Sequence, residues 1–148
     1  MRIHLRFIRN AGFISRAIQW QGWGPGGAWS HVDFVLPEGY LGSQAPDGVR
    51  LRPYNYCTPS AALHCYVDLP DAAGNAILNW ARAQIGKPYD YYSLLGIVMR
   101  RDWQRPDAWF CSEYVAAAFL KGNWPLLRTN EVSRISPPTL SLSTKLIG

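Results

Sequence analysis

The cysteine at position 111 stands at the start of a pattern typical of a helix. Behind Cys111, the apolar residues Val115, Ala118 and Phe119 follow a 3.6-residue period, and Asp107 ahead of them is a helix-start signal. A thiol in the first helical turn faces unpaired backbone N–H groups and the positive end of the helix dipole, which favour the thiolate. The alternative is a small buried hydrophobe, the commoner fate of a free cysteine. A nucleophilic role also requires a nearby base, and the chain has three histidines.

His31 is the histidine best placed to act as that base. It lies in an expected strand whose hydrophobic residues take one face while His31 and Asp33 take the other. The preceding stretch is rich in glycine and carries Trp23 and Trp29, which suits a surface loop that contacts substrate through aromatic rings. Both interpretations have an alternative: a single strand histidine often has a structural role, and the tryptophans can pack on the core.

The remaining histidines and cysteines are expected to be structural. His4 falls among the arginines on the polar face of a first strand, and His64 lies on the polar face of a later one. Cys65 is on the apolar face of that later strand, so we expect it in the core. The spacing of Cys57, His64 and Cys65 does not match a zinc site. The sequence therefore predicts no metal and no other cofactor.

The composition is that of one globular domain. A chain of 148 residues, 48% hydrophobic and 17% charged, can bury a core without disulfides, and we expect a single domain over residues 1–148. Three cysteines do not make a disulfide framework, and the first ten residues hold no signal-peptide core, so we expect a cytoplasmic protein. No apolar run is long enough for a transmembrane segment. The net charge of +5 is scattered along the chain, which argues against a specific nucleic-acid partner. The oligomeric state stays open.

Hydrophobic periodicity places strands in the first half of the chain and helices in the second. The tail from residue 128 is expected to be mostly irregular, with a single helical turn. This order predicts an α+β fold, an antiparallel sheet packed against helices. The strands are expected over residues 3–7, 30–36, 40–45, 49–52 and 63–69, and the helices over 12–20, 71–85 and 92–99 and from residue 111 onward.

Four short motifs, taken in their order, resemble a known family. They are Ser30-His31-Val32, Asp47-Gly48-Val49, Gly86-Lys87-Pro88-Tyr89-Asp90 and Phe110-Cys111-Ser112-Glu113. This set is similar to that of the permuted papain-like amidases of the YiiX/YebB type, bacterial or phage relatives of the NlpC-type cysteine peptidases. The resemblance covers about residues 7 to 120, and it includes the reversed order in which the histidine strand precedes the cysteine helix.

The resemblance implies a cysteine hydrolase that cleaves an amide bond. Cys111 would be the nucleophile and His31 the base, and an acyl-enzyme would form and be released by water or another acceptor. The backbone N–H of Cys111 and the hydroxyl of Tyr89 would hold the oxyanion. Tyr89 can alternatively pack a turn against the sheet. Glu113 points away from the thiol around the helix, so we expect it to anchor the helix to a neighbouring element.

The residue that orients the imidazole departs from the family pattern. Relatives often carry a glutamate on the strand after the histidine strand, but residues 40–45 contain no carboxylate. With a three-residue loop before that strand, Gln44 falls on its far face, whereas a two-residue loop sets Gln44 opposite Asp33 and diagonal to His31. Asp33 shares the face of His31 but lies about 6.6 Å along the strand. The prediction is therefore Gln44, with Asp33 as the alternative.

Two other classes of function stay open. A lipid-directed thiol acyltransferase or esterase, similar to lecithin:retinol acyltransferase-like relatives, would use the same residues on an ester. The aromatic loop and positive charge suit a lipid and an anionic glycan equally. A non-catalytic binding module would keep the fold without a working thiol, and the missing carboxylate favours it. The substrate is therefore expected to be a peptide, another amide or a lipid ester.

Overall fold

The computed structural model describes residues 1–10, 29–91, 95, 107–128 and 135–148. Five strands form one antiparallel sheet in the order β4-β3-β2-β1-β5. The strands are β1 (Arg2–Arg9), β2 (His31–Leu36), β3 (Gly39–Gln44), β4 (Gly48–Arg52) and β5 (Ala61–Asp68). The helices within the described residues are α2 (Asp71–Ala83), α4 (Cys111–Lys121) and α5 (Pro137–Ser141). The predicted α+β fold, with an antiparallel sheet and helices, is confirmed.

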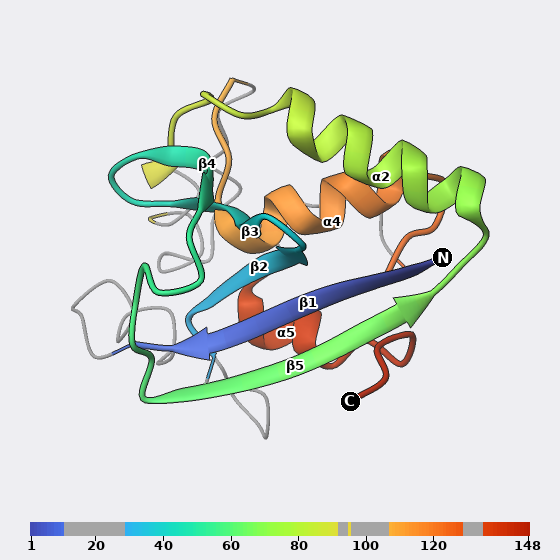
Figure 1. Ribbon diagram of the computed structural model, residues 1–148, viewed down its shortest axis with the longest axis horizontal. Helices are drawn as coiled ribbons and strands as arrows, with labels where there is room; N and C mark the ends of the chain where they lie inside the picture. Colours follow the sequence, from blue (N-terminus) through green and yellow to red (C-terminus); the bar gives the residue numbers. More distant parts are fainter. Residues whose placement is uncertain (11–28, 92–94, 96–106, 129–134) are drawn as a thin grey trace.

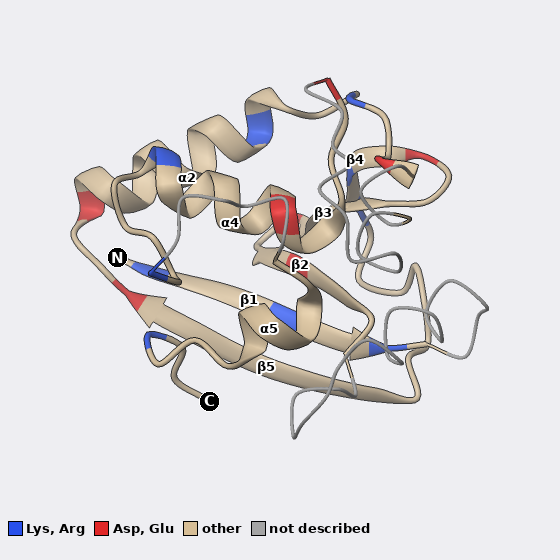
Figure 2. Cartoon of the chain, turned by 180° about the vertical axis from the view of Figure 1, so that it is seen from behind, with Lys and Arg blue, Asp and Glu red and all other residues tan. Residues whose placement is uncertain are grey.

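The helices pack on one side of the sheet. Figure 1 shows α2 and α4 side by side, and Figure 2, from behind, shows α4 and α5 in front of the strands. The sheet meets them with alternate residues, since Ile3, Leu5 and Phe7 of β1 are all buried in the core. This alternation is the one expected from the sequence, and it leaves the other side chains of β1 on the opposite face.

Helix α4 is held against β2 by aromatic packing. The ring of Phe34 meets that of Tyr114 edge-on at 5.8 Å and stacks on that of Phe119 at 6.1 Å. All three side chains are fully buried. Pairs of this kind stabilise beyond the area that they bury. The start of α4 is thereby fixed relative to β2.

A two-residue loop joins β2 to β3. Leu36 pairs with Gly39, so Pro37 and Glu38 form the loop, and the pairing continues through Phe34 and Leu41. On the other side of β2, Arg6 of β1 lies directly opposite Asp33. The two neighbours of β2 therefore approach Asp33 from both sides.

The boundaries of the predicted elements differ little from those observed. Helix α2 ends at Ala83, two residues before the predicted end, and Gly86 then takes a left-handed φ of +97°. The tail carries one short helix, α5, which Ser136 caps by accepting a hydrogen bond from the N–H of Thr139. The helix expected over 12–20 and most of that over 92–99 lie outside the described residues.

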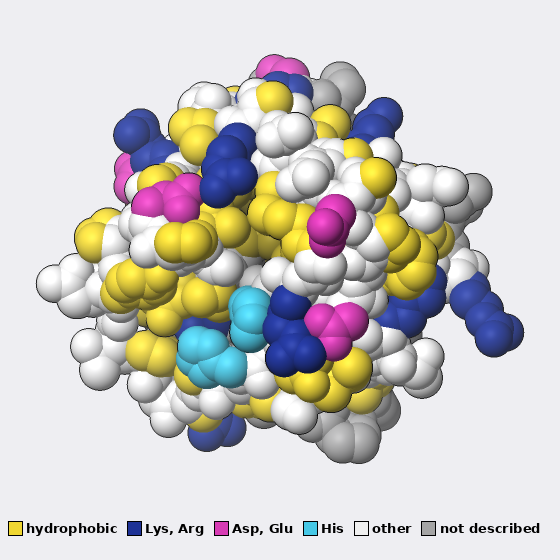
Figure 3. Space-filling view, turned by 45° about the vertical axis from the view of Figure 1, so that its right-hand side comes forward, with side chains coloured by type: hydrophobic (Ala, Val, Ile, Leu, Met, Phe, Trp, Pro, Cys, Tyr) yellow, Lys and Arg dark blue, Asp and Glu magenta, His cyan; other side chains and the backbone are white. Residues whose placement is uncertain are grey.

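Figure 3 shows the side of the molecule that carries the N-terminal end of β1, where hydrophobic side chains gather around a hollow. A cavity of about 460 Å³ there is lined by residues 1–4 and 35–37 together with Tyr54 and Leu78. Neither Cys111 nor His31 lines it, so the candidate chemistry lies elsewhere. None of the described helices combines the length and the apolar character that crossing a membrane requires.

Candidate active site

Cys111 is the first residue of α4, and its side chain is almost fully buried. The helix begins here because Phe110 is extended, with ψ of 152°, and its backbone N–H donates to Oε2 of Glu113 at 3.2 Å. Glu113 therefore caps the start of its own helix. Backbone N–H groups in this first turn have no partner within the helix, so the first turn of α4 favours negative charge.

The segment before Cys111 is fixed on two sides. Trp109 donates its N–H to the carbonyl of Pro88 at 3.0 Å and accepts from the N–H of Asp90 at 3.1 Å. Its carbonyl also accepts a hydrogen bond of 2.6 Å from the hydroxyl of Ser43 in β3. The hydroxyl of Tyr114 donates to the carbonyl of Ala81 at 2.8 Å. These bonds tie the thiol to the sheet, to α2 and to the turn that carries Tyr89.

His31 is the first residue of β2, and its partner is Asp33 of the same strand. Nε2 of His31 lies 2.8 Å from Oδ1 of Asp33, and both side chains are buried. Room for this carboxylate comes from Gly42 on β3, because a Cβ at that position would stand 2.2 Å from Oδ1 of Asp33. Two residues on one strand face can thus bond directly when the neighbouring strand leaves space between them.

The expected partnership of Gln44 with His31 is corrected by this geometry. The loop before β3 does have two residues, but Gly42 rather than Gln44 lies against Asp33. Gln44 is half-buried, and its Oε1 has no hydrogen-bond partner among the described residues. A carboxylate does contact His31, and it comes from Asp33 on β2.

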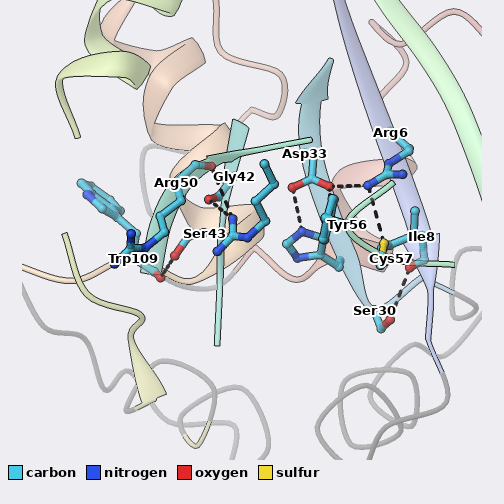
Figure 4. Close-up of polar contacts among 12 residues, drawn as sticks. Arg6, Ile8, Ser30, Asp33, Gly42, Ser43, Arg50, Tyr56, Cys57 and Trp109 are labelled. Carbon is cyan, nitrogen blue, oxygen red and sulfur yellow. Dashed lines mark hydrogen bonds and ion pairs between the residues drawn. The ribbon is translucent and has the colours of Figure 1, made fainter. Parts of the chain in front are cut away.

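Asp33 is itself held by two further groups, which Figure 4 shows converging on one oxygen. Its Oδ2 accepts a hydrogen bond of 2.7 Å from the hydroxyl of Tyr56 and lies 3.0 Å from a guanidinium nitrogen of Arg6. Burial alone would raise the pKa of Asp33, but the charge of His31 and the hydrogen bonds from His31, Tyr56 and Arg6 lower it to about 2. Asp33 is therefore a permanent anion at neutral pH.

His31 is correspondingly held in its protonated form. Burial lowers its pKa, but the charge and hydrogen bond of Asp33, and then the hydrogen bond and charge of Cys111, outweigh burial and raise the pKa to about 10. Asp33 occupies Nε2, so Nδ1 is the ring nitrogen on the other side of the imidazole.

Tyr89, another predicted site residue, lies in the turn that is hydrogen-bonded to the segment before Cys111. Its buried ring packs between Tyr91 at 5.0 Å and Phe110 at 5.9 Å. Burial, and next the charge of Cys111, raise the pKa of Tyr89, so its hydroxyl stays protonated. Its role as an oxyanion donor remains a prediction. Trp29 is half-buried against the core, and Trp23 lies outside the described residues.

Comparison with known proteins identifies the fold. No protein-family model matches the sequence, and no curated protein is a significant match. Among solved structures, the metalloprotein YiiX from Escherichia coli O157:H7 superimposes with a TM-score of 0.69, over 97% of this chain and 93% of that one, at 16% sequence identity. The chain has the YiiX-type fold. At this identity the likeness shows the fold and leaves the chemistry to the residues present.

YiiX is described as a metalloprotein, but the described part of this chain contains no matching metal site. Within the described residues, no three histidine, cysteine or acidic side chains lie close enough to hold a metal ion. Cys65 is buried in the core and His64 is exposed, as predicted. Cys57 is half-buried, with a guanidinium nitrogen of Arg6 at 3.9 Å from its sulfur.

Sequence reasoning did not single out Arg6 and Tyr56, which complete the site of this YiiX-type chain. In the sequence, Arg6 alternates with apolar residues on the same face of β1 as Arg2 and His4, a pattern that indicates a solvated side chain. The available signal was the pairing of β1 with β2, which sets Arg6 opposite Asp33. Opposite charges at directly paired positions of neighbouring strands commonly interact.

Proposed function

We propose that this chain is a cysteine hydrolase of the permuted papain-like type that cleaves an amide bond, in a peptide or another amide. The observation that carries the proposal is the contact of His31 with a buried carboxylate, since Nε2 lies 2.8 Å from Oδ1 of Asp33. Cys111 begins helix α4, and its charge and hydrogen bonding are among the causes that raise the pKa of His31. A carboxylate, an imidazole and a thiol in this order are the components of a nucleophilic triad.

In the proposed reaction, Cys111 and His31 form a thiolate–imidazolium pair. The thiolate attacks the carbonyl carbon of the amide, and the oxyanion accepts hydrogen bonds from the backbone N–H of Cys111 and the hydroxyl of Tyr89. Nδ1 of His31 then gives its proton to the leaving amine, and the C–N bond breaks. Water, deprotonated by the neutral imidazole, attacks the thioester and releases the acid and the free thiol.

Asp33 would act through His31. Its carboxylate orients the ring so that Nδ1 faces the thiol, and its charge stabilises the imidazolium formed in each half of the reaction. The absence of a carboxylate from residues 40–45 had favoured a non-catalytic module. Because the carboxylate of Asp33 lies beside His31, the missing carboxylate no longer favours a non-catalytic module.

The pH dependence of iodoacetamide labelling tests the proposal. Peptide mass spectrometry follows each cysteine separately, so Cys65, whose burial raises its pKa to about 11, is an internal control that should label slowly at every pH below this value. We expect rapid labelling of Cys111 at pH 6 that is lost in His31→Ala. Labelling that begins only near pH 8.5, unchanged in His31→Ala, would exclude the enzyme and leave a binding module.

A substrate panel then separates the two enzymatic alternatives. Peptide and other amides are compared with short- and long-chain esters at equal concentration, using kcat/KM. Turnover of amides, abolished in Cys111→Ala, supports the amidase. Turnover confined to lipid esters would assign the same residues to an acyltransferase or esterase.

A further inference from the structure

Arg6 is a buried cation in the middle of a sheet. Its side chain is only 4% exposed, and its guanidinium stacks over the ring of Tyr40 at 3.3 Å and lies 5.2 Å from the ring of Tyr56. One nitrogen is 3.0 Å from Oδ2 of Asp33, while Nε has no partner among the described residues. Burying an arginine is costly unless its charge is compensated, and Asp33 is the carboxylate that compensates it.

The carboxylate of Asp33 is therefore divided between two cations. Oδ1 serves His31, whereas Oδ2 serves Arg6 and the neutral hydroxyl of Tyr56. Arg6 and Asp33 together carry no net charge. The buried site is then neutral overall when His31 and Cys111 are either both uncharged or paired as imidazolium and thiolate. An imidazolium beside a neutral thiol would leave an uncompensated positive charge.

We infer that Arg6 is a positioning and charge-balancing residue of the site: it takes part of the Asp33 carboxylate so that the thiolate of Cys111, rather than Asp33 alone, is the counterion of the imidazolium. This inference rests on the proposed function, because it assigns Arg6 a role in the same proton transfers. Without Arg6, Asp33 would hold the proton on His31 whatever the state of the thiol, and His31 would release it less readily to a leaving group.

The groups around His31 make the prediction specific. Within the described residues, Asp33 of β2 and Cys111 of α4 are the charged or titratable groups that act on the imidazole. Asp33 is approached in turn by Arg6 of β1 and by Tyr56 of the loop after β4, and by Gly42 of β3, which carries no side chain. Replacing Arg6 by a neutral residue thus removes one positive charge and leaves the Tyr56 anchor in place.

The experiment follows the protonation of His31 directly. Histidine is labelled with 15N in the full-length chain carrying Cys111→Ser, which removes the thiol and with it a group that raises the pKa of His31. His4 and His64 are exposed and serve as internal references in the same spectra. The titration midpoint of His31 is compared with and without Arg6→Gln, with Arg6→Lys, and with Arg2→Gln as the matched control. Arg2, on the same strand as Arg6, forms an exposed ion pair with Asp68 of β5, away from the site.

The charge-balancing role predicts a midpoint about one pH unit higher in Arg6→Gln, a tenfold change in the protonation equilibrium, because the repulsion between guanidinium and imidazolium is lost. Arg6→Lys and Arg2→Gln should leave the midpoint within about 0.3 of a pH unit. An unchanged or lower midpoint in Arg6→Gln would overturn the inference, since a purely structural contact would only loosen Asp33. If Arg6→Gln does not fold, Arg6→Met, which fills the space over Tyr40, must give the same rise.

Failure of the inference and failure of the proposed function are distinguishable. The His31 titration needs no activity, so it tests Arg6 even if Cys111 proves unreactive. With the thiol present, Arg6→Gln should reduce iodoacetamide labelling of Cys111 at pH 6 by about tenfold and leave labelling at pH 9 nearly unchanged. Equal labelling of both proteins at pH 6 would contradict the role of Arg6 while leaving the nucleophile established.

Discussion

Gly42→Ala is the substitution that most directly tests the pairing of Asp33 with His31. A Cβ at residue 42 would lie 2.2 Å from Oδ1 of Asp33, whereas ordinary contact begins at 3.4 Å, so the carboxylate must move by about 1.2 Å (3.4 − 2.2). The hydrogen bond to Nε2 is 2.8 Å long and is lost at about 3.5 Å, a margin of about 0.7 Å. The methyl group therefore displaces Asp33 beyond reach of the imidazole.

The loss of Asp33 should be visible in both partners of the pair. The pKa of His31, held at about 10 chiefly by Asp33 against burial, should fall toward its ordinary value of 6.5. Iodoacetamide labelling of Cys111 at pH 6 should fall by at least about tenfold, because each unit of pKa is a tenfold change in the ion pair. In Gly42→Ala and in the unmodified protein, the pKa of His31 is measured by histidine NMR and the labelling of Cys111 by peptide mass spectrometry.

Gly122→Ala is the matched control. A Cβ there would lie 2.3 Å from Cγ1 of Ile77, a similar clash at a place where φ of −79° permits alanine. Both substitutions should reduce the free energy of unfolding, by about 1–3 kcal/mol each, but Gly122→Ala should keep the labelling profile. Equal profiles in Gly42→Ala and the unmodified protein would refute the pairing.

Three further predictions address the acid stability, the oxyanion site and the packing of α4. The folded pKa of Asp33, about 2 against 3.8 unfolded, contributes about 2 kcal/mol to folding. Denaturant titrations should show this stability present above about pH 4 and lost as the pH falls through 2, a loss absent from Asp33→Asn. Tyr89→Phe should lower kcat on an amide by about 10²–10³ and leave labelling at pH 6 unchanged, whereas equal kcat values would remove Tyr89 from the oxyanion site. Phe119→Ala should cost about 3–5 kcal/mol of unfolding free energy, because its ring is fully buried against Phe34, and a cost below 1 kcal/mol would contradict the packing.

Much of the fold was accessible from the sequence because its periodicities agree with its burial. The alternation of Ile3, Leu5 and Phe7 predicts the inward face of β1, and these residues are buried. The pattern behind Cys111 predicts a helix, and α4 begins at that residue. Hydrophobic patterns report which side of an element faces the core, and they do so one element at a time.

The third member of the site depended on information that such patterns do not contain. Whether His31 can reach Asp33, two positions along its own strand, is decided by rotamers and by the space that Gly42 leaves on β3. Arg6 was missed for a related reason: a charged residue on the polar face of a strand is usually solvated, and here Tyr40 and Tyr56 cover it. Both features arise from contacts between strands.

The site is assembled from distant parts of the chain, and this has a consequence for folding. Arg6, His31, Tyr56 and Cys111 come from three strands or loops and a helix, and the first and last are 105 positions apart (111 − 6). Contacts of such long sequence separation form late, because chain closure must precede them. During refolding, reactivity of Cys111 at pH 6 should therefore appear after the recovery of helical circular dichroism, so the thiol reports completion of the native topology.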